Sequence, residues 1–188
     1  MVVFDTSVLL LVLDSAAKAP TDPATAGPVD RASERIEYLI SNLSADKEKI
    51  IIPTPVLSEV LVHAGAAMQT YLEILNGQAA FRIAPFDQKA AIEAALAMSD
   101  AIRRGGHRVD AANPDVTKTK IKFDRQIVAI AKAEGAHSVY SDDEDVHRYA
   151  IQAGLKAHRT SELDLPPEDP QTILDFSTPP KLSGDEPS

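Results

Sequence analysis

Cysteine is absent from this chain of 188 residues. Its absence excludes disulfide bonds, thiolate zinc sites and cysteine nucleophiles. A chain without disulfides is also compatible with a reducing compartment. We therefore expect a cytoplasmic protein.

Long hydrophobic runs are missing as well. No segment approaches the roughly 18 consecutive apolar residues that a membrane-spanning helix needs, so we expect a soluble protein with no membrane partner. The segment 1–13 is apolar, but it has no basic region at its start and carries Asp5 within the apolar stretch. This pattern does not predict a secretory signal peptide.

Positive charge is scarce, because 19 Lys and Arg residues stand against 28 Asp and Glu residues and the net charge is −9. Such an excess of acid does not favour nucleic-acid binding, which depends on displayed Lys and Arg side chains. Between Ala101 and Arg125, however, seven basic residues outnumber three acids, so this segment carries +4 and the rest of the chain −13. The basic segment is either a phosphate-binding region or a solvated, flexible charged loop.

The remaining composition is typical of a globular domain, with 44% hydrophobic and 25% charged residues. Short apolar runs predict strands at 2–4, 49–53, 81–86, 138–141 and 156–159. Helical spacing predicts helices at 6–13, around 36–43, and at 54–65, 69–75, 87–104, 124–134 and 143–153. Strands separated by helices predict an α/β fold with a mostly parallel sheet.

Proline marks the segments that we expect to be irregular. Three prolines lie between Asp14 and Asp30, and more follow Leu165, where large apolar residues are few. The chain length suits a single domain with a real core. We therefore expect one domain over residues 1–165 and a proline-rich tail over 166–188 that is disordered or pinned on the surface.

Acidic residues recur where predicted strands pass into predicted helices. Asp5 follows the first strand, Glu59 follows the second, Asp124 starts a predicted helix, and Asp143 and Asp145 follow the fourth strand. In an open α/β sheet the functional crevice lies outside the carboxyl ends of the strands, so these acids are expected to meet there. Clustered carboxylates repel one another unless a hard cation lies among them, and Mg²⁺ or Mn²⁺ prefers oxygen ligands. The pattern therefore predicts a metal site for phosphodiester chemistry.

Most of these acids also have a structural alternative. Asp124 stands where a helix-capping Asp is favoured, and the stretch 141–144 has the spacing of a capping box. Glu59 could be a solvent-facing helix residue. Asp5 is harder to explain in this way, because an acid between a buried strand and an apolar helix is costly unless it is paired, capped or metal-bound.

Four stretches of the sequence resemble the PIN-domain family. They are 3–10 (VFDTSVLL), 53–60 (PTPVLSEV), 123–131 (FDRQIVAIA) and 139–145 (VYSDDED), and they occur in the family's order. The resemblance implies a three-layer α/β/α sandwich with PIN-like architecture. It also implies a Mg²⁺- or Mn²⁺-dependent endoribonuclease of the VapC type that cleaves single-stranded or structured RNA. A toxin role, a small antitoxin partner that occludes the acidic pocket, and a homodimer are further implications.

The family pattern can be carried over by position. It implies catalytic roles for Asp5, Glu59, Asp124 and Asp143, and metal ligation by Asp5, Asp124, Asp143 and Asp145. The small hydroxyl residues that accompany the acids, and orient carboxylates or water, match Thr6, Ser7 and Ser141. Asp142 and Asp143 are adjacent, and either could match the family's acidic position. We assign it to Asp143 because the spacing Ser141-x-Asp143-x-Asp145 matches the family better.

The basic residues nearest to Asp124 are candidates for substrate binding. Lys120, Lys122 and Arg125 are expected to hold the RNA backbone, since phosphate contacts position a strand without reading its sequence. The alternative is that they are ordinary charges near a helix start. The segment 14–48 adds an extra loop and helix relative to smaller family members, and it leaves substrate access and oligomer interfaces open.

Two other functions compete with a nuclease. A PIN-like module that binds RNA or protein without cutting is favoured by the acidic net charge. A phosphotransfer enzyme with Asp5 as nucleophile is disfavoured, because Ser7 stands where the haloacid-dehalogenase pattern has a second Asp.

Overall fold

Five parallel strands form the central sheet of the computed structural model, which describes residues 1–104 and 118–167. The strands are β1 (Val2–Phe4), β2 (Ile50–Pro53), β3 (Phe81–Ala84), β4 (Ser138–Tyr140) and β5 (Lys156–His158). Their order across the sheet is β3-β2-β1-β4-β5, and each neighbouring pair is parallel. The predicted α/β class and its parallel sheet are confirmed.

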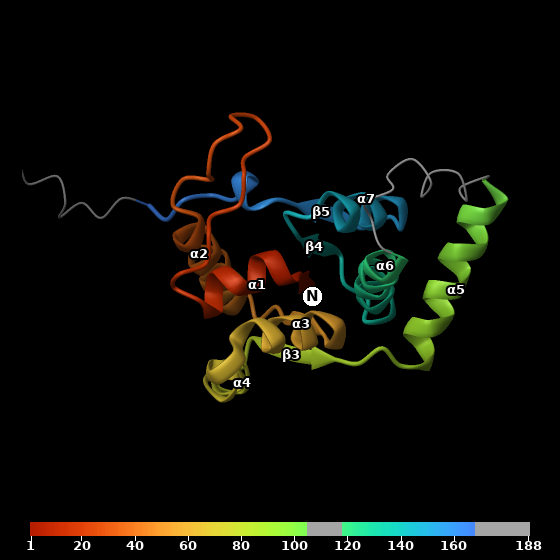
Figure 1. The fold of residues 1–188 in the computed structure, drawn as a ribbon, viewed down its shortest axis with the longest axis horizontal. Helices are drawn as coiled ribbons and strands as arrows, with labels where there is room; N and C mark the ends of the chain where they lie inside the picture. The colour runs from red at the N-terminus through yellow and green to blue at the C-terminus, as the bar shows by residue number, and fades with distance from the viewer. Residues whose placement is uncertain (105–117, 168–188) are drawn as a thin grey trace, which may run out of the picture.

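Helices cover both faces of this sheet (Figure 1). They are α1 (Thr6–Leu13), α2 (Ala32–Ala45), α3 (Thr54–Ala64), α4 (Met68–Gly77), α5 (Gln88–Arg103), α6 (Lys118–Ala133) and α7 (Glu144–Gln152), with short 3₁₀ turns η1 (Gly65–Ala67) and η4 (Thr160–Glu162). In Figure 1, α1, α2 and α4 lie on one side and α5, α6 and α7 on the other. The predicted three-layer arrangement is therefore present.

The central strands are apolar along their whole length because both of their faces are covered. The side chains of β1 and the three isoleucines of β2 are fully buried. In a sheet with one wet face these residues would alternate with polar ones. Burial of such continuous runs explains why the strands could be predicted from sequence.

The chain reverses direction across the sheet at β1. It runs outward from β1 to β2 and β3, then returns to β4 on the other side of β1 and continues outward to β5. In doubly wound sheets, a crevice opens outside the carboxyl ends of the two strands at such a switch point. The fold therefore brings the residues after β1 and after β4 to one place.

The start of α6 differs from the prediction. We expected a helix from about Asp124, but α6 begins at Lys118 and Asp124 is its seventh residue. Asp124 is thus not a helix cap, and that interpretation was wrong. The sequence signal failed because lysines alternate with other residues over 118–122, which hides the helical apolar spacing.

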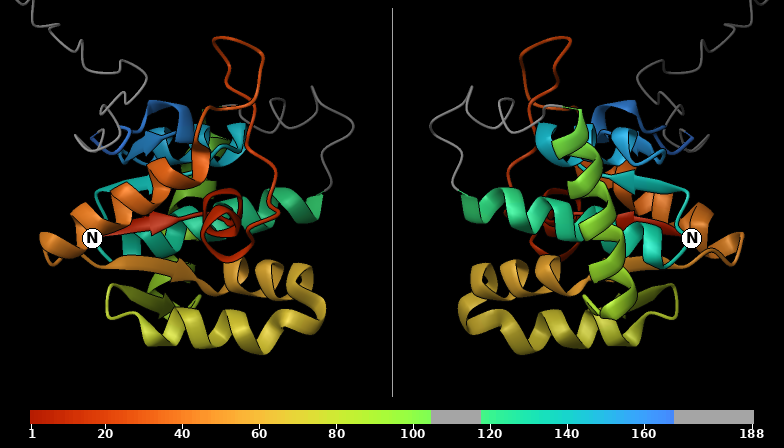
Figure 2. Two further views of the ribbon diagram at one scale, coloured as in Figure 1. Left: turned by 90° about the vertical axis from the view of Figure 1, so that its left-hand side faces the viewer. Right: turned by 90° about the vertical axis from the view of Figure 1, so that its right-hand side faces the viewer.

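The loop of the extra segment, residues 14–31 between α1 and α2, stands out from the body of the domain (Figure 2). An isolated bridge between Thr21 and Pro28 closes it, and no helix or longer strand forms in it, as the prolines predicted. Most of the basic segment, and most of the proline-rich tail, lie outside the described residues. Among the helices described, none is long and apolar enough to cross a membrane.

Candidate functional site

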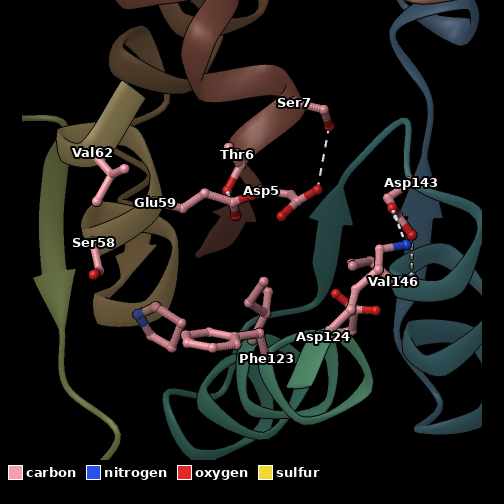
Figure 3. Close-up of a pocket in the computed structure, with 13 residues that line it drawn as sticks. Asp5, Thr6, Ser7, Ser58, Glu59, Val62, Phe123, Asp124, Asp143 and Val146 are labelled. Atoms are coloured by element: carbon pink, nitrogen blue, oxygen red, sulfur yellow. Dashed lines mark hydrogen bonds and ion pairs between the residues drawn. The ribbon is translucent and has the colours of Figure 1, made fainter. Parts of the chain in front are cut away.

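A pocket of about 560 Å³ opens at the carboxyl end of the sheet (Figure 3). Its walls come from the β1–α1 junction, α3, α6 and the start of α7. The lining residues are Asp5, Thr6, Ser7, Pro55, Ser58, Glu59, Val62, Lys120, Phe123, Asp124, Ile127, Asp143 and Val146. All four acids predicted as catalytic therefore line one pocket, although they come from four separate segments of the chain.

Asp5 is held at the point where buried β1 passes into α1. It is the N-cap residue of α1 and is 5% exposed. Its Oδ2 accepts hydrogen bonds from the hydroxyl of Ser141 at 2.7 Å and from that of Ser7 at 3.3 Å. Burial, with the nearby charges of Asp143 and Glu59, raises the pKa of Asp5 from 3.8 to about 6, although the hydrogen bonds from the Ser141 hydroxyl and the Thr6 backbone act to lower it.

The two serines also join the β1–α1 junction to the β4–α7 junction. The hydroxyl of Ser7 accepts a hydrogen bond from the backbone N–H of Asp142 at 3.0 Å, and the hydroxyl of Ser141 accepts one from the N–H of Asp143 at 3.0 Å. Each hydroxyl therefore donates to Asp5 and accepts from a backbone N–H of the β4–α7 junction. This arrangement restricts the position of the Asp5 carboxylate relative to Asp143.

Asp124 lies deep in the pocket wall formed by α6. It is 6% exposed, and its Oδ2 is buried without a hydrogen-bond partner among the described residues. Burial raises the pKa of Asp124 from 3.8 to about 7, Asp143 adds to the rise, and Lys120 opposes it. A buried carboxylate oxygen without a donor is costly in a folded protein unless a cation satisfies it.

Asp143 is the N-cap residue of α7 and points into the same pocket. Its Oδ1 accepts from the backbone N–H of Asp145 at 2.8 Å and of Val146 at 3.3 Å, and its Oδ2 pairs with Lys120 Nζ at 2.8 Å. Burial acts to raise the pKa of Asp143, but the hydrogen bonds from Lys120 and these N–H groups outweigh it, and the pKa falls below its ordinary value. Asp143 is therefore an ionised partner for the protonatable Asp124.

Three acids converge closely enough to share one ion. Asp124, Asp143 and Asp145 each place a carboxylate oxygen within 4.8 Å of the others. Asp145 also pairs with Arg148 at 2.6 Å. The donor set is all oxygen, which suits Mg²⁺ or Mn²⁺, and it includes Asp124, whose Oδ2 has no hydrogen-bond partner among the described residues. The described residues thus fit a divalent cation, and Asp5 lines the same pocket beside them.

Glu59 reaches the pocket from α3. Its side chain is exposed, as the structural alternative expected, but it lines the pocket and accepts a hydrogen bond from Thr6 Oγ1 at 2.7 Å. In Figure 3 Glu59 lies beside Thr6 and Asp5. Thr6 therefore holds a pocket carboxylate by a donated hydrogen bond.

The structure separates the neighbouring acids Asp142 and Asp143. Asp142 accepts hydrogen bonds from the backbone N–H of Thr160 at 2.9 Å and from its hydroxyl at 2.6 Å. It therefore ties the β4–α7 junction to η4, whereas Asp143 lines the pocket.

The three basic candidates occupy different places. Lys120 lines the pocket, but of the described lining residues none is Lys122 or Arg125. Lys122 is exposed on α6. The guanidinium of Arg125 lies 5.2 Å from the centre of the Tyr149 ring and donates to the sulfur of Met98 at 3.2 Å, so it packs between α5 and α7.

An apolar wall faces the acids, and the sequence did not single it out. Phe123 and Val62 are 45% and 80% exposed at this pocket, while Asp124 and Asp143 lie across from Val62 (Figure 3). The available signal was the position of Phe123 directly before Asp124 in a helix. The part of the pocket beside Phe123 and Val62 therefore suits a flat or apolar group, and the part beside Asp124 and Asp143 suits a cation and a phosphate.

Comparison with known proteins gives a fold but no close relative. No family model and no curated protein matches the chain. One similar solved structure is VapBC2 from Rickettsia felis bound to a DNA fragment from their promoter, with 15% identity over 85% of this chain and 98% of that chain and a TM-score of 0.55. Another is DNA-bound VapBC from Salmonella typhimurium, with 15% identity over 85% of this chain and 97% of that chain and a TM-score of 0.51.

The chain has a PIN-like fold. At 15% identity this likeness concerns the fold alone, and the chemistry depends on the residues of the pocket. The likeness covers most of the chain, so the predicted PIN-like architecture is confirmed for the described domain.

Proposed function

We propose that this protein is a divalent-metal-dependent endoribonuclease that hydrolyses RNA phosphodiester bonds. The observation that carries the proposal is the meeting of Asp5, Glu59, Asp124 and Asp143 in one pocket. Repulsion between these acids raises the pKa of both Asp5 and Asp124 in addition to the effect of burial. Such a cluster is costly for the fold and is best explained by a bound cation.

The metal ligands in this proposal are Asp124, Asp143 and Asp145, with Asp5 directly bound or acting through water. A divalent cation at this position supplies charge that polarises a phosphate and lowers the pKa of a bound water. The raised pKa values of Asp5 and Asp124 fall when positive charge is bound beside them, because an opposite charge favours the ionised form. Magnesium and manganese fit the oxygen donors equally, so the proposal covers both.

The surrounding side chains position these acids. Ser7 and Ser141 hold Asp5 through donated hydrogen bonds, and Thr6 holds Glu59 in the same way. A ligand whose outer partner is fixed keeps its orientation before the cation arrives. The chain's own contribution is thus a preformed acidic pocket, and no covalent nucleophile is needed.

The apolar wall favours a single-stranded substrate. A base turned out of its stack can lie on an aromatic side chain, and such stacking contributes about 1–3 kcal/mol per base. Phe123 is positioned for this contact beside Asp124. The net charge of −9 argues against broad electrostatic binding of RNA, so recognition would depend on this local pocket.

A protein partner is part of the proposal. The similar structures from Rickettsia felis and Salmonella typhimurium are VapBC complexes bound to DNA. By analogy, this chain would be the toxin of a toxin–antitoxin pair, with a small antitoxin covering the pocket and a second copy forming a homodimer. The exposed Val62 and Phe123 give an antitoxin an apolar rim to contact.

The test compares Asp5→Asn and Asp124→Asn with the wild type in cleaving a single-stranded RNA with Mn²⁺. Both variants should retain the fold by circular dichroism and lose at least about 100-fold in rate, because each removes a charged group at the cation. Asp46→Asn, which removes an exposed acid at the C-cap of α2, is the matched control and should cleave normally. Full activity in both pocket variants, or activity in a chelator, contradicts the proposal.

A non-catalytic binding module is the second candidate, and the acidic net charge favours it. It predicts binding of RNA or of a partner protein that is unaffected by removal of divalent ions. Metal-dependent turnover by the wild type that is lost in Asp124→Asn excludes this candidate.

A further inference from the structure

One cation already lies inside the acidic cluster, and it belongs to the chain itself. The ammonium nitrogen of Lys120 is 2.8 Å from Asp143 Oδ2 and 3.4 Å from Asp145 Oδ2. Asp124 is the third acid of this cluster, and its charge also acts on Lys120. The ammonium thus contacts two of the three acids that would hold a divalent ion.

The helix geometry explains why Lys120 in particular reaches this place. Residues four apart lie on the same face of a helix, so Lys120 and Asp124 share one face of α6, whereas residues two apart do not face each other. Lys122 is therefore turned away from the acids, and it is exposed and does not line the pocket. The two lysines differ in position but carry the same charge on the same helix.

We propose that Lys120 is an internal counter-ion of the metal site: its ammonium pairs with the acids when the divalent ion is absent, and metal binding must displace it from Asp143 and Asp145. This inference rests on the proposed metal site, but it concerns a different property, the competition between a side chain and the ion. The competition follows from geometry, because the same carboxylate oxygens cannot be fully shared by an ammonium and a divalent ion.

The acids around Lys120 favour its charged form, which is the form that competes with the divalent ion. Burial acts to lower the pKa of Lys120, but the hydrogen bond and charge of Asp143 outweigh it and raise the pKa to about 12. The ammonium therefore stays charged at neutral pH. Without this ammonium, the ion pair of Asp145 with Arg148 would remain among the described residues as partial compensation for the repulsion between the acids.

The proposal predicts opposite effects on two measurable properties. Removal of the ammonium should destabilise the metal-free protein, because an ion pair is lost and the acids repel. The same change should tighten binding of the divalent ion, because the competitor is gone. If Lys120 only supported the fold, its removal would weaken both the stability of the metal-free protein and the binding of the divalent ion. If Lys120 only contacted RNA phosphate, its removal would change neither property.

The experiment is a calorimetric titration of the full chain with Mn²⁺ alone, comparing Lys120→Met with Lys122→Met. We expect the Kd of Lys120→Met to be at least about fivefold lower than that of the wild type, a scale set by one partly exposed ion pair. The melting temperature of Lys120→Met in a chelator should be lower than that of the wild type, and its rise on adding Mn²⁺ should be larger. Lys122→Met should match the wild type in both measurements.

The outcomes separate this inference from the proposed function. An unchanged or weaker Mn²⁺ affinity in Lys120→Met overturns the counter-ion role. Asp124→Asn, titrated in parallel, tests the metal site itself, because normal Mn²⁺ binding by this variant would remove the site on which the inference rests. If Lys120→Met does not fold, Lys120→Gln takes its place, since its amide still donates a hydrogen bond to Asp143 without carrying charge, and the same affinity criterion applies.

Discussion

From the burial of Asp124 we predict an effect on stability that can be measured without an activity assay. Asp124 is 6% exposed and its pKa is raised from 3.8 to about 7. The folded state therefore holds a proton on Asp124 that the unfolded state releases near its ordinary pKa. The contribution of Asp124 to stability is fully present below about pH 4 and is lost as the pH rises to about 7.

The size of the effect follows from the same values. One pKa unit is worth about 1.4 kcal/mol, so ionised Asp124 costs the metal-free fold up to about 4 kcal/mol. Of this, about 2 to 3 kcal/mol should be lost between about pH 5 and about pH 8. Asp124→Asn has nearly the same shape and no charge, so it should be more stable than the wild type at about pH 8 by at least about 2 kcal/mol.

The assay is urea unfolding in a chelator at about pH 5 and at about pH 8, monitored by circular dichroism. The difference in unfolding free energy between Asp124→Asn and the wild type should be much smaller at the lower pH, where the wild-type carboxyl is protonated. Asp46→Asn, an exposed acid at the C-cap of α2, serves as the control and should follow the wild type. Equal stability of Asp124→Asn and the wild type at both pH values would falsify the assignment of a buried, unpartnered carboxylate.

Three further predictions concern the surroundings of the acids. Ser141→Ala removes the 2.7 Å hydrogen bond to Asp5, and we expect Mn²⁺ affinity to fall about tenfold or more in a calorimetric titration, with the fold unchanged by circular dichroism; normal affinity would mean that the hydroxyl does not orient the acid. Phe123→Ala should weaken binding of a single-stranded RNA, measured with Ca²⁺ in place of Mn²⁺, by about 1–3 kcal/mol and leave Mn²⁺ affinity unchanged. An equal RNA affinity would show that no base stacks on this ring. Asp142→Ala removes the acceptor for the fully buried Thr160 and should cost about 1–3 kcal/mol of unfolding free energy without changing Mn²⁺ affinity. A loss of Mn²⁺ binding with normal stability would reverse the roles assigned to the two neighbouring acids.

The sheet and most helices were predictable because their signals are local. Apolar runs such as 50–52 are buried on both faces, and α5 lies within the predicted helix 87–104, where Asp87 caps it by accepting from the N–H of Ala90. The start of α6 was not predictable in this way, because the residues over 118–122 carry charge on alternate positions. Helix formation there depends on contacts that the sequence pattern does not display.

The sequence by itself determined which acids follow which strands. Because a parallel sheet sends the carboxyl ends of its strands to one edge, these acids meet there. Only the tertiary structure decided how the side chains are used. Asp142 and Asp143 are neighbours in the sequence, yet Asp143 lines the pocket and Asp142 binds Thr160. Lys120 enters the acidic cluster, whereas Arg125 packs against Tyr149. The direction of each side chain depends on how α6 and α7 pack against the sheet and each other, and that packing is a property of the whole fold.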